Sequence, residues 1–165
     1  MKNFFFYSLF LITVFLTTSG CNQKVDLTSE KTNVKTVVDQ FVQFWETHDM
    51  ELLSNIMAHE ADMVNYGSDA SEHFIGWEGF KDAVVKMLPS FQDTKITVKD
   101  QVIKISSAGD VAWFSETWDW NLKVDGNPVQ INGQRLTGVL EKQNSNWVFV
   151  QFHNSVPVTV TKQLN

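Results

Sequence analysis

Two side chains in the last third of the sequence, Arg135 and His153, carry functional groups suited to holding or transforming a ligand. An arginine presents a planar fork of N–H donors that matches a carboxylate or a phosphate. A histidine has an unperturbed pKa near neutrality, so it can donate or accept a proton under physiological conditions. Each also has a structural interpretation, in which Arg135 pairs with a carboxylate such as Glu116 and His153 makes only structural hydrogen bonds.

Strand periodicity decides which side chains accompany these two. Residues two positions apart lie on the same face of a strand, so Thr137 belongs with Arg135, while Gln151 and Ser155 belong with His153. Because a meander makes the two strands neighbours, we predict that both sets face one internal cavity and orient an anionic or carbonyl group there. Periodicity alone does not say which face of the sheet is the inner one. The apolar wall of this cavity is expected from Val139, Trp147 and Phe149.

The preceding strand offers carboxylates and aromatic rings. Glu116 and Asp119 are candidates for acid/base catalysis together with His153. Trp118 and Trp120 share a face with Glu116 and could stack against a ligand, although a core or interface position is their commoner role. Both faces of this strand are partly apolar, which predicts helices on one side of the sheet and the second subunit of a homodimer on the other.

The remaining candidates narrow the chemistry. Tyr66 is a further possible ligand contact. His59 and Glu60 are not followed by a second histidine at zinc-protease spacing, so neither a metal site nor a cofactor is expected. The chain has 13 basic and 19 acidic residues and a net charge of −6, without a basic stripe, which disfavours nucleic-acid binding.

The elements that must position these residues begin with helices. Apolar residues recur at helical spacing from Val34 to Trp45, which predicts a long amphipathic helix that ends near His48. Asp49 is a suitable N-cap for a short second helix. A third helix is expected from Trp77 until it is stopped by Pro89.

From Thr94 onward the apolar period changes to two. Four strands joined by turns are expected, at residues 94–105, 111–122, 129–142 and 147–158. Helices followed by an antiparallel meander predict an α+β domain spanning residues 34–158.

The amino-terminal segment predicts export and lipid anchoring. Residues 1–20 combine an early lysine, an apolar run and small residues, as in a cleavable signal peptide. Cys21 is the only cysteine, and its position after Gly20 resembles the acylation site of bacterial lipoproteins. We therefore expect a lipid at Cys21, a flexible tether over 21–33 and a short tail at 159–165. Asn22 after the cysteine favours the outer over the inner membrane of a bacterial envelope.

Phrases spread along the chain resemble SnoaL-like domains of the nuclear transport factor 2-like superfamily, and the resemblance covers about Val34 to Val158. It implies three helices wrapped by a strongly curved sheet, with a pocket inside the resulting cone. The phrases are His48-Asp49 with Leu52-Leu53, Gly76-Trp77-Glu78-Gly79-Phe80, Gly109-Asp110-Val111-Ala112-Trp113, and Arg135, Thr137, Trp147, His153, Ser155 and Pro157.

The resemblance also implies a range of functions, because this superfamily includes ketosteroid isomerases and polyketide cyclases that use acid/base chemistry without a metal. Aligned on ketosteroid isomerase, Asn65 occupies the position of the catalytic base, and an amide cannot abstract a proton at neutral pH. Three hypotheses remain. The leading hypothesis is non-catalytic binding of a small apolar or anionic molecule. The two alternatives are acid/base catalysis of the SnoaL type and an interaction module of the cell envelope.

Overall fold

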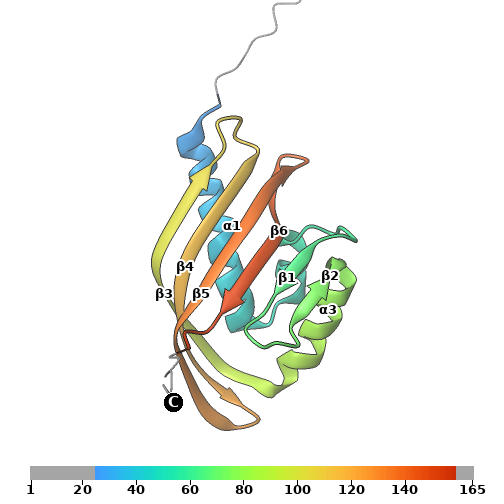
Figure 1. Cartoon of the computed structure of the whole chain (residues 1–165), viewed down its shortest axis with the longest axis vertical. Coiled ribbons are helices and arrows are strands. Elements are labelled where there is room, and N and C mark those ends of the chain that lie inside the picture. The colour runs from blue at the N-terminus through green and yellow to red at the C-terminus, as the bar shows by residue number, and fades with distance from the viewer. Residues whose placement is uncertain (1–24, 159–165) are drawn as a thin grey trace, which may run out of the picture.

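The computed structural model describes residues 25–158, in which helices pack against one curved sheet (Figure 1). The signal segment 1–20, Cys21 and the tail 159–165 lie outside the described residues. The helices are α1 (Leu27–Thr47), α2 (Met50–Ile56) and α3 (Gly76–Met87), followed by a single 3-10 turn, η1 (Leu88–Ser90). The strands are β1 (Val64–Tyr66), β2 (His73–Ile75), β3 (Phe91–Ile105), β4 (Val111–Val124), β5 (Asn127–Gln143) and β6 (Asn146–Ser155). The predicted α+β fold, with helices first and a long meander afterwards, is confirmed.

The helical stripe on α1 faces the sheet as its spacing predicted. Val34, Val38 and Phe41 are buried along α1, and the stripe continues to Trp45 near its carboxyl end. His48 ends the helix in a left-handed conformation, and its backbone N–H donates to the Phe44 carbonyl at 2.7 Å. The chain then enters α2, whose predicted N-cap is confirmed because the Asp49 side chain accepts hydrogen bonds from two backbone N–H groups.

The start of α1 corrects the predicted tether. Residues 21–33 were expected to lack regular structure, but the chain is helical from Leu27 onward. The Asp26 carboxylate accepts hydrogen bonds from the backbone N–H groups of Thr28 and Ser29 at 3.0 and 3.2 Å, which satisfies donors that a helix terminus otherwise leaves unpaired. Glu30, one turn later, binds the sheet, so this turn also gains tertiary contacts.

The sheet runs in the order β2-β1-β6-β5-β4-β3, and it is not closed into a barrel. The four long strands pair antiparallel, as predicted. β1 pairs with β6 in parallel, which departs from the all-antiparallel expectation. β2 was not expected, because a strand of only three residues has too short a pattern to recognise.

One irregularity changes which side chains of β6 point inward. Leu140 of β5 pairs with Phe149, but the neighbouring Val139 pairs with Gln151, so Val150 is an extra residue on β6. Such a bulge reverses the alternation of faces beyond it. Phe149 is therefore buried before the bulge and Phe152 after it, although the two residues have opposite parity.

The core between α1 and the sheet is built largely from aromatic rings. The Phe41 ring centroid lies 5.8 Å from that of Trp118, 5.1 Å from that of Phe149 and 5.3 Å from that of Phe152. Tilted pairs at these separations add to the stabilisation that burial itself provides. Within residues 25–158, no helix is long and apolar enough to cross a membrane.

Candidate functional site

Arg135 and His153 lie on the outer, solvent-exposed face of the sheet. Arg135 pairs across the ladder with Ser155, and Thr137 pairs with His153, so the prediction that these residues share one face is confirmed. Gln151 is also exposed on this face and Ser155 is half-buried. The prediction that this face lines an internal cavity is wrong.

Burial along β5 explains the error. The alternate residues Gln134, Leu136 and Leu140 are buried, so they form the inner face, and Arg135 and Thr137 necessarily point outward. On β6 the bulge at Val150 reverses the alternation, so Gln151 and His153 point outward although Phe149, which has the same parity, is buried. The expected apolar wall is divided accordingly, because Trp147 and Phe149 are buried in the core whereas Val139 belongs to the outer face.

Tyr66 joins the outer face rather than a pocket. Its ring stacks on that of His73, with centroids 4.7 Å apart, and meets His153 edge-on at 5.9 Å. Tyr66 is 43% exposed, so the three rings form a surface cluster over β2, β1 and β6.

The three residues proposed for acid/base catalysis do not meet. Glu116 is buried on the inner face, opposite Leu136, while His153 is on the outer face. Glu116 accepts hydrogen bonds from Trp118 Nε1 at 2.6 Å and from Gln101 Nε2 at 2.8 Å, and not from Arg135, whose suggested ion pair with Glu116 is wrong. Burial raises the pKa of Glu116, against the opposing effect of its two donors.

Asp119 has a structural role at an irregular point of the sheet. It accepts the backbone N–H of Gly133 at 2.8 Å and an ion-pair contact from Lys99. Both hydrogen bonds lower the pKa of Asp119, and the one from Lys99 has the larger effect. Gly133 has a φ of +69° beside the register shift between β4 and β5, so the carboxylate secures this bulge.

A cavity of about 130 Å³ lies elsewhere, at the wide end of the cone, where the carboxyl ends of α1, β4 and β6 meet the start of β3. This volume is close to that of engineered apolar cavities that bind benzene, roughly 150 Å³. Trp120 is the only one of the predicted ligand-binding residues that lines it; Trp118 is buried next to it in the core. The walls are mostly apolar, and the lining residues are Trp45, Gly67, Ser68, Glu72, Phe74, Phe80, Met87, Phe91, Trp120, Leu122, Val124, Ile131, Gln134, Phe152 and Asn154.

Four polar atoms of cavity-lining residues are buried without a hydrogen-bond partner among the described residues. Two are indole donors, Trp45 Nε1 and Trp120 Nε1, and two are amide oxygens, Gln134 Oε1 and Asn154 Oδ1. Buried polar groups are normally paired, and each unpaired one costs about 1–3 kcal/mol. All four atoms belong to residues that line the same apolar hollow.

In the described part of the chain, the cavity wall contains a single charged side chain, the half-buried Glu72, whose Oε2 accepts the backbone N–H of Asp69 at 2.9 Å. Among residues 25–158, no cationic side chain lines the cavity. Asn65, at the position that the isomerase comparison gives to a base, is fully buried, and its Oδ1 accepts the Phe152 N–H at 2.9 Å. This arrangement can bind through dispersion and neutral hydrogen bonds, and it does not favour an anion.

Sequence reasoning missed Gln134 and Asn154 because it assigned the cavity to the opposite face of the strands, the face of Arg135 and His153. The available signal was the inner set of β5, in which Gln134 is followed at alternate positions by Leu136, Gly138 and Leu140. A polar residue that begins such an apolar series is a candidate for the mouth of a pocket.

Comparison with known proteins agrees with this architecture. The model of the SnoaL-like domain family matches residues 34–159. The chain belongs to the SnoaL-like domain family. Among curated proteins none matches the chain.

Solved structures of NTF2-like proteins share the fold of this SnoaL-like domain. A nuclear transport factor 2-like protein from Salmonella enterica serovar Typhimurium is 16% identical, with a TM-score of 0.72 over 81% of this chain and 95% of its own. A putative dehydratase from Streptomyces avermitilis is also 16% identical, with a TM-score of 0.71 over 80% and 99%. A putative scytalone dehydratase from Novosphingobium aromaticivorans is 11% identical, with a TM-score of 0.67 over 84% and 91%. At these identities the similarity shows the fold alone.

Proposed function

We propose that this SnoaL-like domain binds a small uncharged molecule in the cavity at the wide end of its cone. The guest has an apolar body about the size of one ring, together with groups that both accept and donate hydrogen bonds. The observation that carries the proposal is the set of four unpaired polar atoms around one apolar cavity, two indole N–H donors and two amide oxygens. Hydrogen-bond acceptors on the guest would pair with the indole N–H groups of Trp45 and Trp120. A donor on the guest would pair with the amide oxygen of Gln134 or Asn154.

The hypothesis of acid/base catalysis has less support, since its three named residues are separated in the structure. The anionic alternative is likewise disfavoured, because the one charge that the described residues place on the wall is the carboxylate of Glu72. We further propose that the domain is held at the bacterial envelope by a lipid on Cys21, as the sequence predicts.

Thermal stability with phenol and with benzoate tests the binding proposal. A ligand that binds only the folded state raises the melting temperature in proportion to its occupancy. We expect millimolar phenol to raise the melting temperature and benzoate, of similar size but anionic, to have no effect.

The informative variant is Gln134→Leu. It removes an unpaired buried acceptor, so the empty protein should be at least as stable as the wild type, while the rise with phenol should diminish. Thr137→Val, on the outer face of the same strand, is the matched control and should keep the full response. An equal response to benzoate, or an unchanged phenol response in Gln134→Leu, would contradict the proposal.

We also propose a homodimer formed through the outer face of the sheet. Trp113 is 48% exposed and Val102 is 50% exposed, and both border a shallow hollow that Val139 and Gln151 complete. Exposed apolar surface of this kind is characteristic of protein interfaces.

Light scattering on the lipid-free mature chain, with Cys21→Ser, should give twice the monomer mass. Trp113→Asp should give the monomer, because it places a charge in the apolar contact. Lys123→Ala, at the far end of the same strand, should remain dimeric. A wild-type chain that is monomeric at high concentration rules the dimer out.

A further inference from the structure

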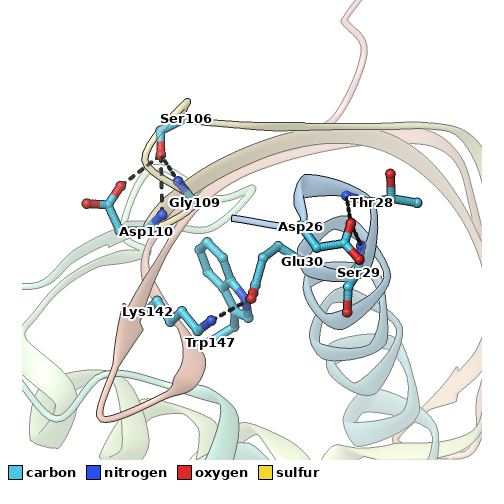
Figure 2. A network of polar contacts seen from close by, with 9 residues as sticks. All are labelled: Asp26, Thr28, Ser29, Glu30, Ser106, Gly109, Asp110, Lys142 and Trp147. Atoms are coloured by element: carbon cyan, nitrogen blue, oxygen red, sulfur yellow. Dashed lines mark hydrogen bonds and ion pairs between the residues drawn. The ribbon is translucent and has the colours of Figure 1, made fainter. Parts of the chain in front are cut away.

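The amino-terminal end of the domain is fixed to the sheet. Val25 and Leu27 lie against Gly109 in the turn between β3 and β4, where a Cβ atom on Gly109 would come within 2.4 Å of Val25 Cγ1. Gly109 has a φ of +74°, and the turn is held by the Ser106 hydroxyl, which bonds to the Asp110 carboxylate at 2.8 Å and to backbone N–H groups (Figure 2). The first described residues therefore sit on a rigid turn.

A second attachment lies one helical turn further on. Glu30 accepts a hydrogen bond from Lys142 Nζ at 2.6 Å and another from Trp147 Nε1 at 2.8 Å (Figure 2). These donors belong to β5 and β6, so the helix start is bound to both strands near the turn that joins them. Asp26 caps the first turn of α1, so the path of the chain relative to the sheet is fixed from Val25 onward.

The distance from this end to Cys21 is short. Four Cα–Cα steps separate Cys21 from Val25, and an extended chain covers about 3.3–3.6 Å per residue, so the two positions are at most about 14 Å apart. A lipid on Cys21 would hold this end of the domain near the bilayer surface. Val25 and Leu27 are themselves 40% and 41% exposed, which gives the end an apolar contact surface.

The cavity lies at the opposite end of the molecule. Trp45 is eighteen residues beyond Leu27 on α1, which corresponds to about 27 Å along the helix axis. The other cavity residues agree, since Phe91 begins the strand that ends at the β3–β4 turn and Asn154 is near the end of β6. In Figure 1 the β3–β4 turn lies beside the start of α1, and the β4–β5 turn lies at the far end.

We propose that the end face formed by Val25, Leu27 and the β3–β4 turn (the anchor face) rests against the lipid surface, so that the cavity opens away from the membrane toward the aqueous phase. This inference rests on the proposed lipid anchor and goes beyond it. A flexible tether of 13 residues would allow all orientations, whereas the observed start of α1 limits them. Asp26 and Asp110 beside the anchor face are exposed carboxylates that accept internal hydrogen bonds, and the apolar part of the contact comes from Val25 and Leu27.

Energy transfer from the protein to labelled lipids tests the orientation. The full lipoprotein, acylated at its only cysteine, is reconstituted into phosphatidylcholine vesicles that carry a lipid-attached acceptor. A single new thiol for the donor dye is placed at exposed Ser107 in the β3–β4 turn, or at exposed Asn127 beside the β4–β5 turn. We expect transfer from Ser107→Cys to be several-fold higher than from Asn127→Cys.

Insertion of a long Gly/Ser linker between Lys24 and Val25 is the control, and it should make the two signals similar. Equal transfer from both positions in the native-length chain, or higher transfer from Asn127→Cys, overturns the orientation while leaving the anchor intact. Flotation of the vesicles tests the anchor separately. If wild type fails to float with the vesicles, or floats no better than Cys21→Ala, the anchor proposal fails and the orientation fails with it.

Discussion

Replacing Trp118 with alanine should lower the free energy of unfolding by about 3–5 kcal/mol, the usual cost of removing a large aromatic side chain from a core. Trp118 is fully buried, with its ring 5.8 Å from Phe41 and 5.6 Å from Trp120. Its indole N–H is also one of two donors to the buried Glu116 carboxylate. The alanine variant therefore loses packing and leaves a buried charge less well solvated, and urea denaturation followed by circular dichroism measures the sum.

The pH dependence separates these two contributions. Burial already raises the pKa of Glu116 above its ordinary value of 4.5, and loss of the Trp118 donor raises it further. An acid with a raised folded-state pKa binds its proton more tightly when folded, so stability falls as the pH rises from the unfolded toward the folded pKa. The deficit of the variant should consequently be larger at about pH 8 than at about pH 5.

Trp118→Phe is the matched control, because it removes the indole donor while it keeps a buried aromatic ring and so loses less packing than alanine. It should show a smaller loss with the same pH trend. A deficit in Trp118→Ala that is independent of pH would mean that the indole does not support the charged form of Glu116.

Removal of the Glu30 carboxylate should have the next largest effect. Glu30→Ala is expected to cost about 1–3 kcal/mol at neutral pH, because Trp147 Nε1 and Lys142 Nζ both lose their acceptor. The Glu30 side chain is only 14% exposed, in contrast to Lys35 and Asp39, which are 54% and 47% exposed in an ion pair on the same helix. Lys35→Ala is therefore the matched control, with an expected change below about 0.5 kcal/mol.

The pH dependence of this effect follows from the pKa of Glu30, which is lowered mainly by the hydrogen bond from Lys142 and then by that from Trp147. A lowered folded-state pKa gives stability that is present above the unfolded pKa and is lost as the pH falls through the folded pKa. The difference between wild type and Glu30→Ala should therefore shrink in acid. Comparison with Trp147→Phe and the double variant measures the coupling, and a coupling near zero would show that the contact does not secure the start of α1.

The helices and long strands were predictable because their apolar periods persist over many residues. The stripe from Val34 to Trp45 and the alternation along Val111–Val124 each repeat often enough to identify an element. The Asp26 cap was an available local signal for the start of α1, but the contacts of Glu30 with Lys142 and Trp147 join residues more than a hundred positions apart in the sequence. No local pattern reports contacts of that kind.

The candidate site was harder to predict than the fold. Correct parity grouped Arg135 with His153, but choosing the inner face required a comparison with the more apolar series through Leu136 and Leu140. The cavity itself depends on how Trp45, Gln134 and Asn154 converge from three elements, and on the polar atoms that this convergence leaves unpaired. Spacing within one strand contains no information about such a convergence.

The extra residue at Val150 decides which side chains of β6 face the interior and which face solvent. Upstream of it odd-numbered residues point into the cone, and downstream of it even-numbered residues do, so Phe149 and Phe152 can both contact Phe41. If the same residues were paired with β5 without the bulge, regular alternation beyond Phe149 would turn His153 to the interior and Asn154 to solvent. Deletion of Val150 would leave a regular ladder in which Phe149, Phe152 and Asn154 still point inward, so the bulge accommodates one additional residue without exchanging the two faces of the strand.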